Sequence, residues 1–203
     1  MIVKPEELQA NCMKFFKNDA LATQVWMSKY AKRDSQGNFV ESTPEERFLD
    51  IAHEIYMAGG KYANDDYHLR SRDIYEYLVS RTILPGGSGL YGIGNQYSVS
   101  TLGNCFVVSL NNEDSYGSIL KVHEEIVQIA KRRGGIGVDI SCLRPSGASV
   151  SNSAGSSTGA VSFVQRYSNT TREVAQSGRR GALMISISVN HPDIMDFINL
   201  KLD

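Results

Sequence analysis

Three short apolar runs alternate with amphipathic stretches in the second half of the chain, and this alternation constrains the fold more than any other feature. The runs are CFVVSL (105–110), GIGVDIS (135–141) and ALMISISV (182–189), and the amphipathic stretches cover 115–131 and 158–176. Near-continuous apolar strands that alternate with helices are typical of parallel sheets buried on both faces. The pattern therefore predicts a parallel α/β sheet or barrel, with a further helix over 191–202. Because three strands leave an unpaired sheet edge, we expect these residues to be the first part of a larger domain.

The first third of the chain is helical in pattern. Apolar residues recur at helical spacing over 6–17 and 20–31, and a short helix is expected over about 71–81. The segment TPEERFLDIA begins with Thr43 as N-cap, and Glu46 three residues later completes a capping box. After this part the composition becomes rich in glycine and serine. The two expected domains are a helical one over 1–82 and an α/β one over 83–203.

Charge and composition argue against several classes of protein. The 203 residues carry a formal net charge of −1, so bulk electrostatic binding of nucleic acid is not expected. No apolar run approaches the roughly 20 residues that span a bilayer, and the first residues lack the pattern of a secretory signal. Three scattered cysteines without CxxC spacing argue against a disulfide framework or a structural zinc site and for the reducing cytosol. The four histidines show no metal-ligand spacing, so no metal site is expected.

Several polar or glycine-rich segments stand where the expected elements begin or end. They are GGSG (86–89), GGIG (134–137) and SGRRG (177–181). Glycine lets backbone amides approach a phosphate, but GGIG precedes a strand, and this position favours tight packing at a helix-to-strand turn as its explanation. SGRRG is either a basic clamp for a phosphate or base, or a solvated turn. Arg144 either binds an anion or caps the sheet, and Asp114-Ser115 is first of all an N-cap whose free amides can also attract a ligand.

Seven blocks in one order resemble the large catalytic subunit of ribonucleotide reductase. The blocks are DALATQVWMSKYA, TPEERFLDIA, LPGGSGLYGIGN, STLGNCFVV, KRRGGIGVDISCLRPSGA, STGAVSFVQRYSNTTREVAQSGRRGA and HPDIMDFI. In this family a helical N-terminal domain precedes a ten-stranded α/β barrel. The resemblance therefore implies a helical domain and the first barrel strands, with the barrel completed by another chain. It also implies thiyl-radical reduction of ribonucleoside di- or triphosphates to deoxyribonucleotides for DNA synthesis.

The same resemblance implies roles for individual residues. Cys105 corresponds to one of the two cysteines that are oxidised to a disulfide when the ribose 2′-hydroxyl leaves as water. The implied residues of the specificity-effector site, which binds a deoxynucleoside triphosphate or ATP and relays its identity to the substrate base, are Asp114, Ser115, Tyr116, Arg144, Gln176 and Arg180. Arg144 is expected to lie across from Asp114. The implied substrate contacts are Ser88, Asn104 and Gly135.

The sequence also departs from the family pattern. No nucleotide-binding cone precedes residue 20, and a second effector-phosphate arginine of some members falls near Ser151. The radical cysteine, the partner of Cys105 and the C-terminal tail cysteines are not in these residues, so we expect them on a partner chain. The radical source is expected to be adenosylcobalamin or a separate dimetal subunit. The sequence motifs GRRGA and HPDI favour adenosylcobalamin. A thioredoxin-like thiol reductant and a homodimer formed through the effector-site helices are also implied.

Three hypotheses for the function remain open from the sequence. The leading one is the N-terminal part of a split reductase, which supplies the effector site, part of the substrate cleft and one redox thiol. The second is a nucleotide-binding regulatory module without an enzymatic partner. The third is an unstable product of a truncated gene. A neighbouring reading frame with the remaining strands separates the first two, and expression of the chain without a partner tests the third.

Overall fold

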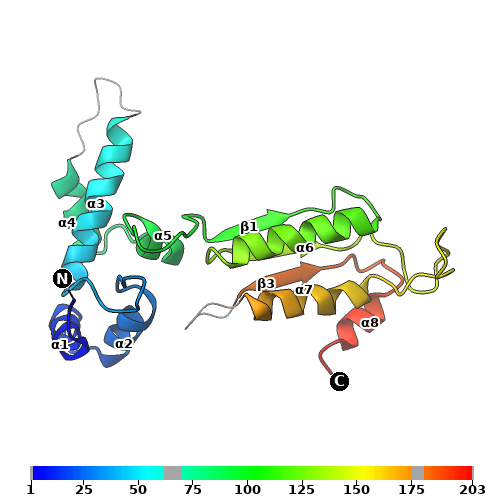
Figure 1. Ribbon diagram of the computed structural model, residues 1–203, viewed down its shortest axis with the longest axis horizontal. Helices are drawn as coiled ribbons and strands as arrows, with labels where there is room; N and C mark the ends of the chain where they lie inside the picture. The colour runs from blue at the N-terminus through cyan, green and yellow to red at the C-terminus, as the bar shows by residue number, and fades with distance from the viewer. Residues whose placement is uncertain (1, 62–69, 175–180, 203) are drawn as a thin grey trace. The chain divides into compact units, whose positions relative to one another are not determined.

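The computed structural model describes residues 2–61, 70–174 and 181–202 (Figure 1). The chain divides into two compact units, one that ends at Asn104 and one that begins at Cys105. Within the described ranges, no helix is long and apolar enough to cross a membrane.

The first unit is helical. Its elements are α1 (Pro5–Phe15), α2 (Ala20–Lys29), α3 (Pro44–Gly60), α4 (Ser71–Val79) and α5 (Gly87–Gly92). One face of each longer helix contributes to a shared core, in which Leu8, Trp26 and Ile51 are buried. The Thr43 hydroxyl accepts from the Glu46 amide at 3.3 Å. In a capping box the Glu46 carboxylate would accept from the amide of Thr43. Here it accepts instead from the amide of the preceding residue, Ser42, at 2.8 Å.

A buried arginine joins the glycine-rich segment to this helical unit. Arg47 of α3 is 0 % exposed. Its guanidinium donates to the carbonyl of Leu90 at 2.9 Å and to that of Tyr91 at 3.0 Å, and it also bonds the carbonyl of Ile93. Residues 83–104 therefore belong to the first unit, whereas the composition had suggested a boundary at residues 82 and 83. The glycine-rich composition that begins at residue 83 therefore does not mark the boundary between the two units.

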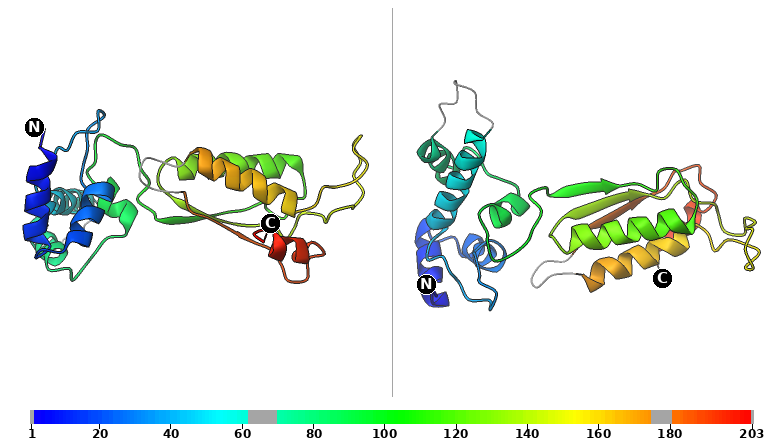
Figure 2. Two further views of the ribbon diagram at one scale, coloured as in Figure 1. Left: turned by 90° about the horizontal axis from the view of Figure 1, so that it is seen from below. Right: turned by 45° about the horizontal axis from the view of Figure 1, so that its top comes forward.

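The second unit contains a three-stranded parallel sheet in the described residues, with the order β1-β2-β3. Its elements are β1 (Cys105–Val108), α6 (Tyr116–Ala130), β2 (Gly135–Asp139), α7 (Val161–Glu173), β3 (Leu183–Ser186) and α8 (Ile194–Asn199). Both views in Figure 2 show α6 and α7 side by side on the same face of the sheet. Val122, Ile126 and Tyr167 from these helices pack on Ile136 and Val138 of the central strand. The predicted strand–helix alternation is confirmed.

The other face of the sheet is uncovered among the described residues. Val107 of β1 is 88 % exposed and Met184 of β3 is 70 % exposed. Successive side chains of a strand point to opposite faces, and among the described residues both long helices lie on the same face. The apolar residues of each strand therefore divide into those that lie under the helices and those that lie on the face without helices. When further strands close such a sheet into a barrel, the face without helices becomes the interior of the barrel.

The turn between α6 and β2 explains the GGIG segment. A β-carbon on Gly134 would lie 2.4 Å from Cγ2 of Ile129 and 3.1 Å from the ring of Phe106. Arg133, just before it, has a φ of 71°. Gly134 is thus required by close packing of helix against strand, as the structural interpretation of this segment predicted.

Candidate functional site

Asp114 and Arg144 meet where β1 leads into α6 and β2 leads into the next loop. Arg144 Nε donates to Asp114 Oδ2, and Arg144 Nη1 donates to the carbonyl oxygen of Ser149 at 3.0 Å. The N-cap of α6 is Ser115, whose hydroxyl accepts from the amide of Ser118 at 3.1 Å. Asp114 lies one residue earlier, and its carboxylate is engaged by Arg144 instead of by the helix amides. The expected placement of Arg144 across from Asp114 is confirmed.

These two residues line a pocket of about 240 Å³. Tyr116 and Phe163 line it as well, with their rings in edge-to-face contact at a centroid distance of 5.8 Å. Ser151, at the position where some family members have a second arginine, is also in its wall. The pocket thus combines a cation, a carboxylate, several hydroxyls and two aromatic rings. A ligand with an anionic part, a hydroxylated part and a planar ring would find a partner for each.

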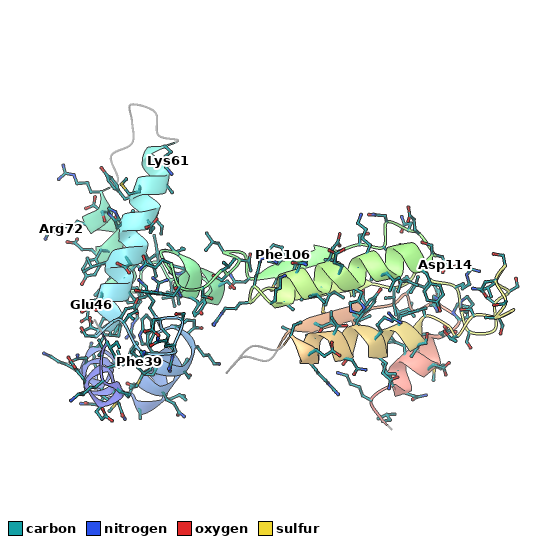
Figure 3. The ribbon with its side chains drawn as sticks, viewed as in Figure 1. Phe39, Glu46, Lys61, Arg72, Phe106 and Asp114 are labelled. Atoms are coloured by element: carbon teal, nitrogen blue, oxygen red, sulfur yellow. The ribbon has the colours of Figure 1, made fainter. Side chains whose placement is uncertain are left out.

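Cys105 lies at the opposite end of β1 from this pocket. Figure 3 labels Phe106, which follows Cys105, and Asp114, and the two labelled residues lie towards opposite ends of β1. Cys105 is exposed and unpaired, on the open face of the sheet, and its register partner on β2 is Gly135. The next residues on this face are Val107 and, opposite it, Gly137, whose added β-carbon would come no closer than 4.0 Å to any other atom. Val107 and Met184 project from the same face, so the part of this face without side chains is the stretch of β2 at Gly135, which is buried, and Gly137.

Two of the expected substrate contacts come together in the first unit. The amide of Ser88 donates to Oδ1 of Asn104 at 2.9 Å, and Ser88 is 0 % exposed. A β-carbon on Gly86 would overlap the Asn104 amide group, at 2.0 Å from Nδ2. The GGSG segment is thus held against Asn104. Of the remaining expected effector residues, Gln176 and Arg180 lie outside the described residues.

The described residues hold no group of three or more His, Cys, Asp or Glu side chains arranged for a metal ion. Cys142, close to the pocket, is half-buried, and burial raises the pKa of its thiol. Phe163, His191 and Asp193 were not predicted as site residues. Phe163 looked like one apolar position of an amphipathic helix, and HPD looked like the entry to a helix, so the sequence pattern offered no sign of their contacts.

Comparison with known proteins connects these features. Residues 103–203 match the family model "Ribonucleotide reductase, barrel domain". A vitamin B12-dependent ribonucleoside-diphosphate reductase of Mycobacterium tuberculosis is 32% identical over 184 residues, which are 90% of this chain and 26% of that protein. The protein of the same name from Thermoplasma acidophilum is 33% identical over 173 residues, 85% of this chain and 20% of that protein. The large chain of the Schizosaccharomyces pombe enzyme is 29% identical over 164 residues, 80% of this chain and 19% of that protein.

Among solved structures, the alpha subunit of a class Id ribonucleotide reductase from Actinobacillus ureae is similar with a TM-score of 0.61 and 20% identity. The similarity covers 77% of this chain and 26% of that one, and it supports the fold. The chain thus spans about a quarter or less of the length of the relatives that it matches. The parallel sheet with helices on one face is the beginning of an α/β barrel. The chain belongs to the ribonucleotide reductase large-subunit family.

Proposed function

We propose that this chain forms part of a ribonucleotide reductase and contributes a redox thiol to the reduction of ribonucleotides. The observation that carries the proposal is the exposed thiol of Cys105 opposite Gly135 on the open face of the sheet. In a barrel that face encloses the substrate. A glycine beside the thiol leaves room for a sugar to approach it, and a side chain there would compete for the same space.

The proposed reaction is a two-electron reduction of the ribose. A cysteine thiyl radical, on a residue outside this chain, starts the reaction at the sugar. The 2′-hydroxyl leaves as water, and Cys105 and a second cysteine supply two electrons and two protons as their thiols become one disulfide. An external dithiol of the thioredoxin type then reduces this disulfide by thiol exchange, which requires an accessible sulfur. The exposure of Cys105 fits that requirement.

The substrate is proposed to be a ribonucleoside diphosphate or triphosphate. The relatives named above are diphosphate reductases. Ser88, Asn104 and Gly135 are proposed as substrate contacts. The bond between Ser88 and Asn104 places the first two residues next to each other.

The pocket beside Asp114 and Arg144 is proposed as the specificity-effector site for a deoxynucleoside triphosphate or ATP. Arginine makes charge-assisted hydrogen bonds to phosphate. The Asp114 carboxylate can accept from sugar hydroxyls or base amino groups, and the rings of Tyr116 and Phe163 offer an apolar surface to a base. Gln176 and Arg180 are proposed to relay the identity of the effector to the substrate.

The radical source is proposed to be adenosylcobalamin, since two of the relatives are named as vitamin B12-dependent. A separate dimetal subunit is the alternative. No described side-chain cluster is suited to hold a metal ion, so we assign no described residue to either source. We propose that another polypeptide supplies the remaining barrel and the radical cysteine. The effector-site helices are proposed to form a homodimer. The proposed location is the cytoplasm, where the three free cysteines stay reduced.

Reconstitution tests this proposal against the regulatory-module alternative. The 203-residue chain is combined with a polypeptide that carries the remaining barrel strands, with a dithiol reductant and with either adenosylcobalamin or a dimetal subunit. We expect deoxyribonucleotide formation from the combination and none from the chain alone, because the open face of three strands encloses no substrate. Nucleotide binding without turnover in every combination would favour the regulatory module.

A further inference from the structure

Two buried polar residues after β3 hold the loop that forms one wall of the pocket. His191 is 7 % exposed and Asp193 is 6 % exposed. The pocket loop is defined here as residues 144–158, which supply Arg144 and more than half of the residues around the pocket. We propose that His191 and Asp193 are positioning residues that fix this loop for nucleotide binding. The inference rests on the proposed effector site and adds residues that lie outside the pocket itself.

Asp193 joins the two ends of the pocket loop. Its carboxylate accepts from the amide of Ser146 at 3.0 and 3.2 Å and from the amide of Ala160 at 2.9 Å. Ser146 and Ala160 are 14 positions apart in the sequence. Hydrogen bonds to an ionised acceptor are stronger than those between neutral groups. One side chain therefore closes the base of the loop with charge-assisted bonds to both ends.

Between these ends the loop forms an irregular hairpin. Gly147 donates to the carbonyl of Ser157 at 3.0 Å, and Ser157 donates to that of Ala148 at 2.8 Å. Val150 donates to the carbonyl of Gly155 at 3.2 Å. Backbone bonds thus run from the base towards the tip, and a base held by Asp193 sets the position of the residues that face the pocket.

His191 fixes the residue that precedes Arg144. Nε2 of His191 lies 2.7 Å from the carbonyl oxygen of Leu143, and Nδ1 accepts from the amide of Asp193 at 3.0 Å. A carbonyl oxygen only accepts, so this geometry selects the tautomer with its hydrogen on Nε2. His191 therefore connects Leu143, itself part of the pocket wall, to the backbone of Asp193.

A glycine makes the close approach of these segments feasible. Gly159 has a φ of +87°, which side-chain-bearing residues rarely adopt. An added β-carbon would lie 2.7 Å from Asp193 Oδ2 and 2.9 Å from both Cβ and the amide nitrogen of Ser146. Both the backbone conformation and the available space thus require glycine where the Asp193 carboxylate meets the two ends of the loop.

The expected consequence concerns affinity. A loop that is already ordered does not have to be ordered when the ligand binds. In Asp193→Asn the negative charge is lost and an NH2 group replaces one carboxylate oxygen, so either a backbone amide of the loop meets a second donor or both bonds fall on one neutral oxygen. We expect deoxynucleotide affinity to fall about tenfold. Asp196→Asn is the matched control, since Asp196 is an exposed carboxylate in the first turn of α8 and undergoes the same change of charge.

The experiment is a calorimetric titration, with dATP, dGTP, dCTP and dTTP, of the chain and its variants assembled with the polypeptide that carries the remaining barrel strands. The variants are Asp193→Asn, His191→Ala, Asp196→Asn and, for the pocket itself, Arg144→Ala. Amide hydrogen exchange is measured in parallel. In Asp193→Asn and His191→Ala we expect faster exchange within the pocket loop and unchanged exchange at Ile136 and Val138 of β2. A general loss of stability would instead accelerate exchange in β2 as well.

The outcomes distinguish the proposed effector site from the proposed positioning role of His191 and Asp193. Weaker binding in Arg144→Ala, Asp193→Asn and His191→Ala, with wild-type affinity in Asp196→Asn, supports both. Weaker binding in Arg144→Ala with wild-type affinity in Asp193→Asn and His191→Ala overturns the positioning role and leaves the effector site standing. Absence of binding by the assembled wild type, or equal binding by the assembled wild type and the assembled Arg144→Ala, refutes the effector site, and the positioning role falls with it.

Discussion

Arg144 Nε donates a hydrogen bond to Asp114 Oδ2 across 30 positions of sequence, and this bond joins the loops that follow two neighbouring parallel strands. Their side chains are 38% and 29% exposed, so the pair is accessible to a ligand. The guanidinium donates from Nε to the carboxylate, from Nη1 to the carbonyl of Ser149 at 3.0 Å and from Nη2 to the carbonyl of Asp114 at 3.5 Å. Its remaining N–H groups are oriented by these bonds before any phosphate arrives.

Arg144→Ala is expected to weaken binding of deoxynucleotide effectors roughly tenfold to a hundredfold. This range corresponds to the loss of about 1.5–3 kcal/mol for a hydrogen bond to a charged group. In the assembled reductase, the control of the effector over which base is reduced should flatten, while unstimulated turnover persists. Arg166→Ala, at an exposed position of α7, is the control and should bind normally. Unchanged affinity in Arg144→Ala would place the specificity site elsewhere.

Cys105→Ser in the reconstituted enzyme is expected to abolish sustained turnover and to leave effector binding intact. Serine preserves the shape of the side chain and removes its redox chemistry. Cys142→Ser, at the other cysteine of the second unit, should retain turnover. Multiple-turnover assays and thermal melts separate this from a packing role, in which Cys105→Ser would lower stability modestly and keep activity.

Arg47→Met is expected to destabilise the first unit by about 3–5 kcal/mol, because it leaves three backbone carbonyls without their donor and removes one of the two buried cations, Arg47 and Lys32, beside the Glu41 carboxylate. Burial raises the pKa of Glu41 and lowers that of Arg47. Adding Glu41→Gln to Arg47→Met should therefore recover part of the loss. Denaturant unfolding followed by fluorescence of Trp26, the single tryptophan of the chain, measures both effects.

The control for this pair is Arg72→Met. Arg72 forms an exposed pair with Glu76 on α4, with its side chain 84% exposed, so its removal should leave the denaturant midpoint nearly unchanged. A similar loss in Arg72→Met and Arg47→Met would contradict the role given to burial. Faster exchange of the Leu90 and Ile93 amides in Arg47→Met would show that the segment around Ser88 has loosened.

The first unit is expected to lose stability at alkaline pH through Cys12. Burial, with a smaller contribution from Glu45 and Glu41, raises the pKa of this thiol from 9.0 to about 11. Because the folded pKa lies above the unfolded one, the contribution to stability is complete below pH 9 and is lost as the pH rises towards 11. The full loss is roughly 3 kcal/mol. Cys12→Ala should show a flatter dependence between pH 9 and 11, and an equal slope in the two proteins would rule out this thiol as the cause.

The same argument applies to the second unit at higher pH. Burial raises the pKa of Tyr167 from 10.0 to about 12, and its hydroxyl donates to the carbonyl of Ile119 at 3.2 Å. Stability should therefore fall as the pH rises from 10 to 12. Tyr167→Phe should reduce that slope, which near-ultraviolet circular dichroism of the second unit can follow.

Much of the fold was predictable from the sequence, because helical and strand periodicity are local properties. The strands expected over 105–110, 135–141 and 182–189 are found as Cys105–Val108, Gly135–Asp139 and Leu183–Ser186. The expected runs are longer because apolar residues continue past the last ladder bond. An apolar run does not by itself reveal which of its residues lie on the covered face of the sheet and which lie on the open face.

The site was predictable in part. The sequence and the family resemblance singled out Asp114, Tyr116 and Arg144, and all three line the same pocket. The expected effector-site roles of these three residues, and the roles expected of Gln176, Arg180 and Cys105, remain predictions. The contribution of Phe163 was missed because an aromatic residue at helical spacing has the same pattern whether it faces a core or a pocket.

The sequence by itself determined the types and order of the elements, the capped start of α3 and the glycines at turns, since each depends on neighbours within a few residues. Only the tertiary structure decided that residues 83–104 belong with the helical unit and that Asp193 closes a loop 47 positions before it. The reason is physical. Parallel strands must be joined by crossovers, which bring residues some 30 to 50 positions apart to the same end of the sheet. Which of them then touch depends on packing that no local pattern encodes.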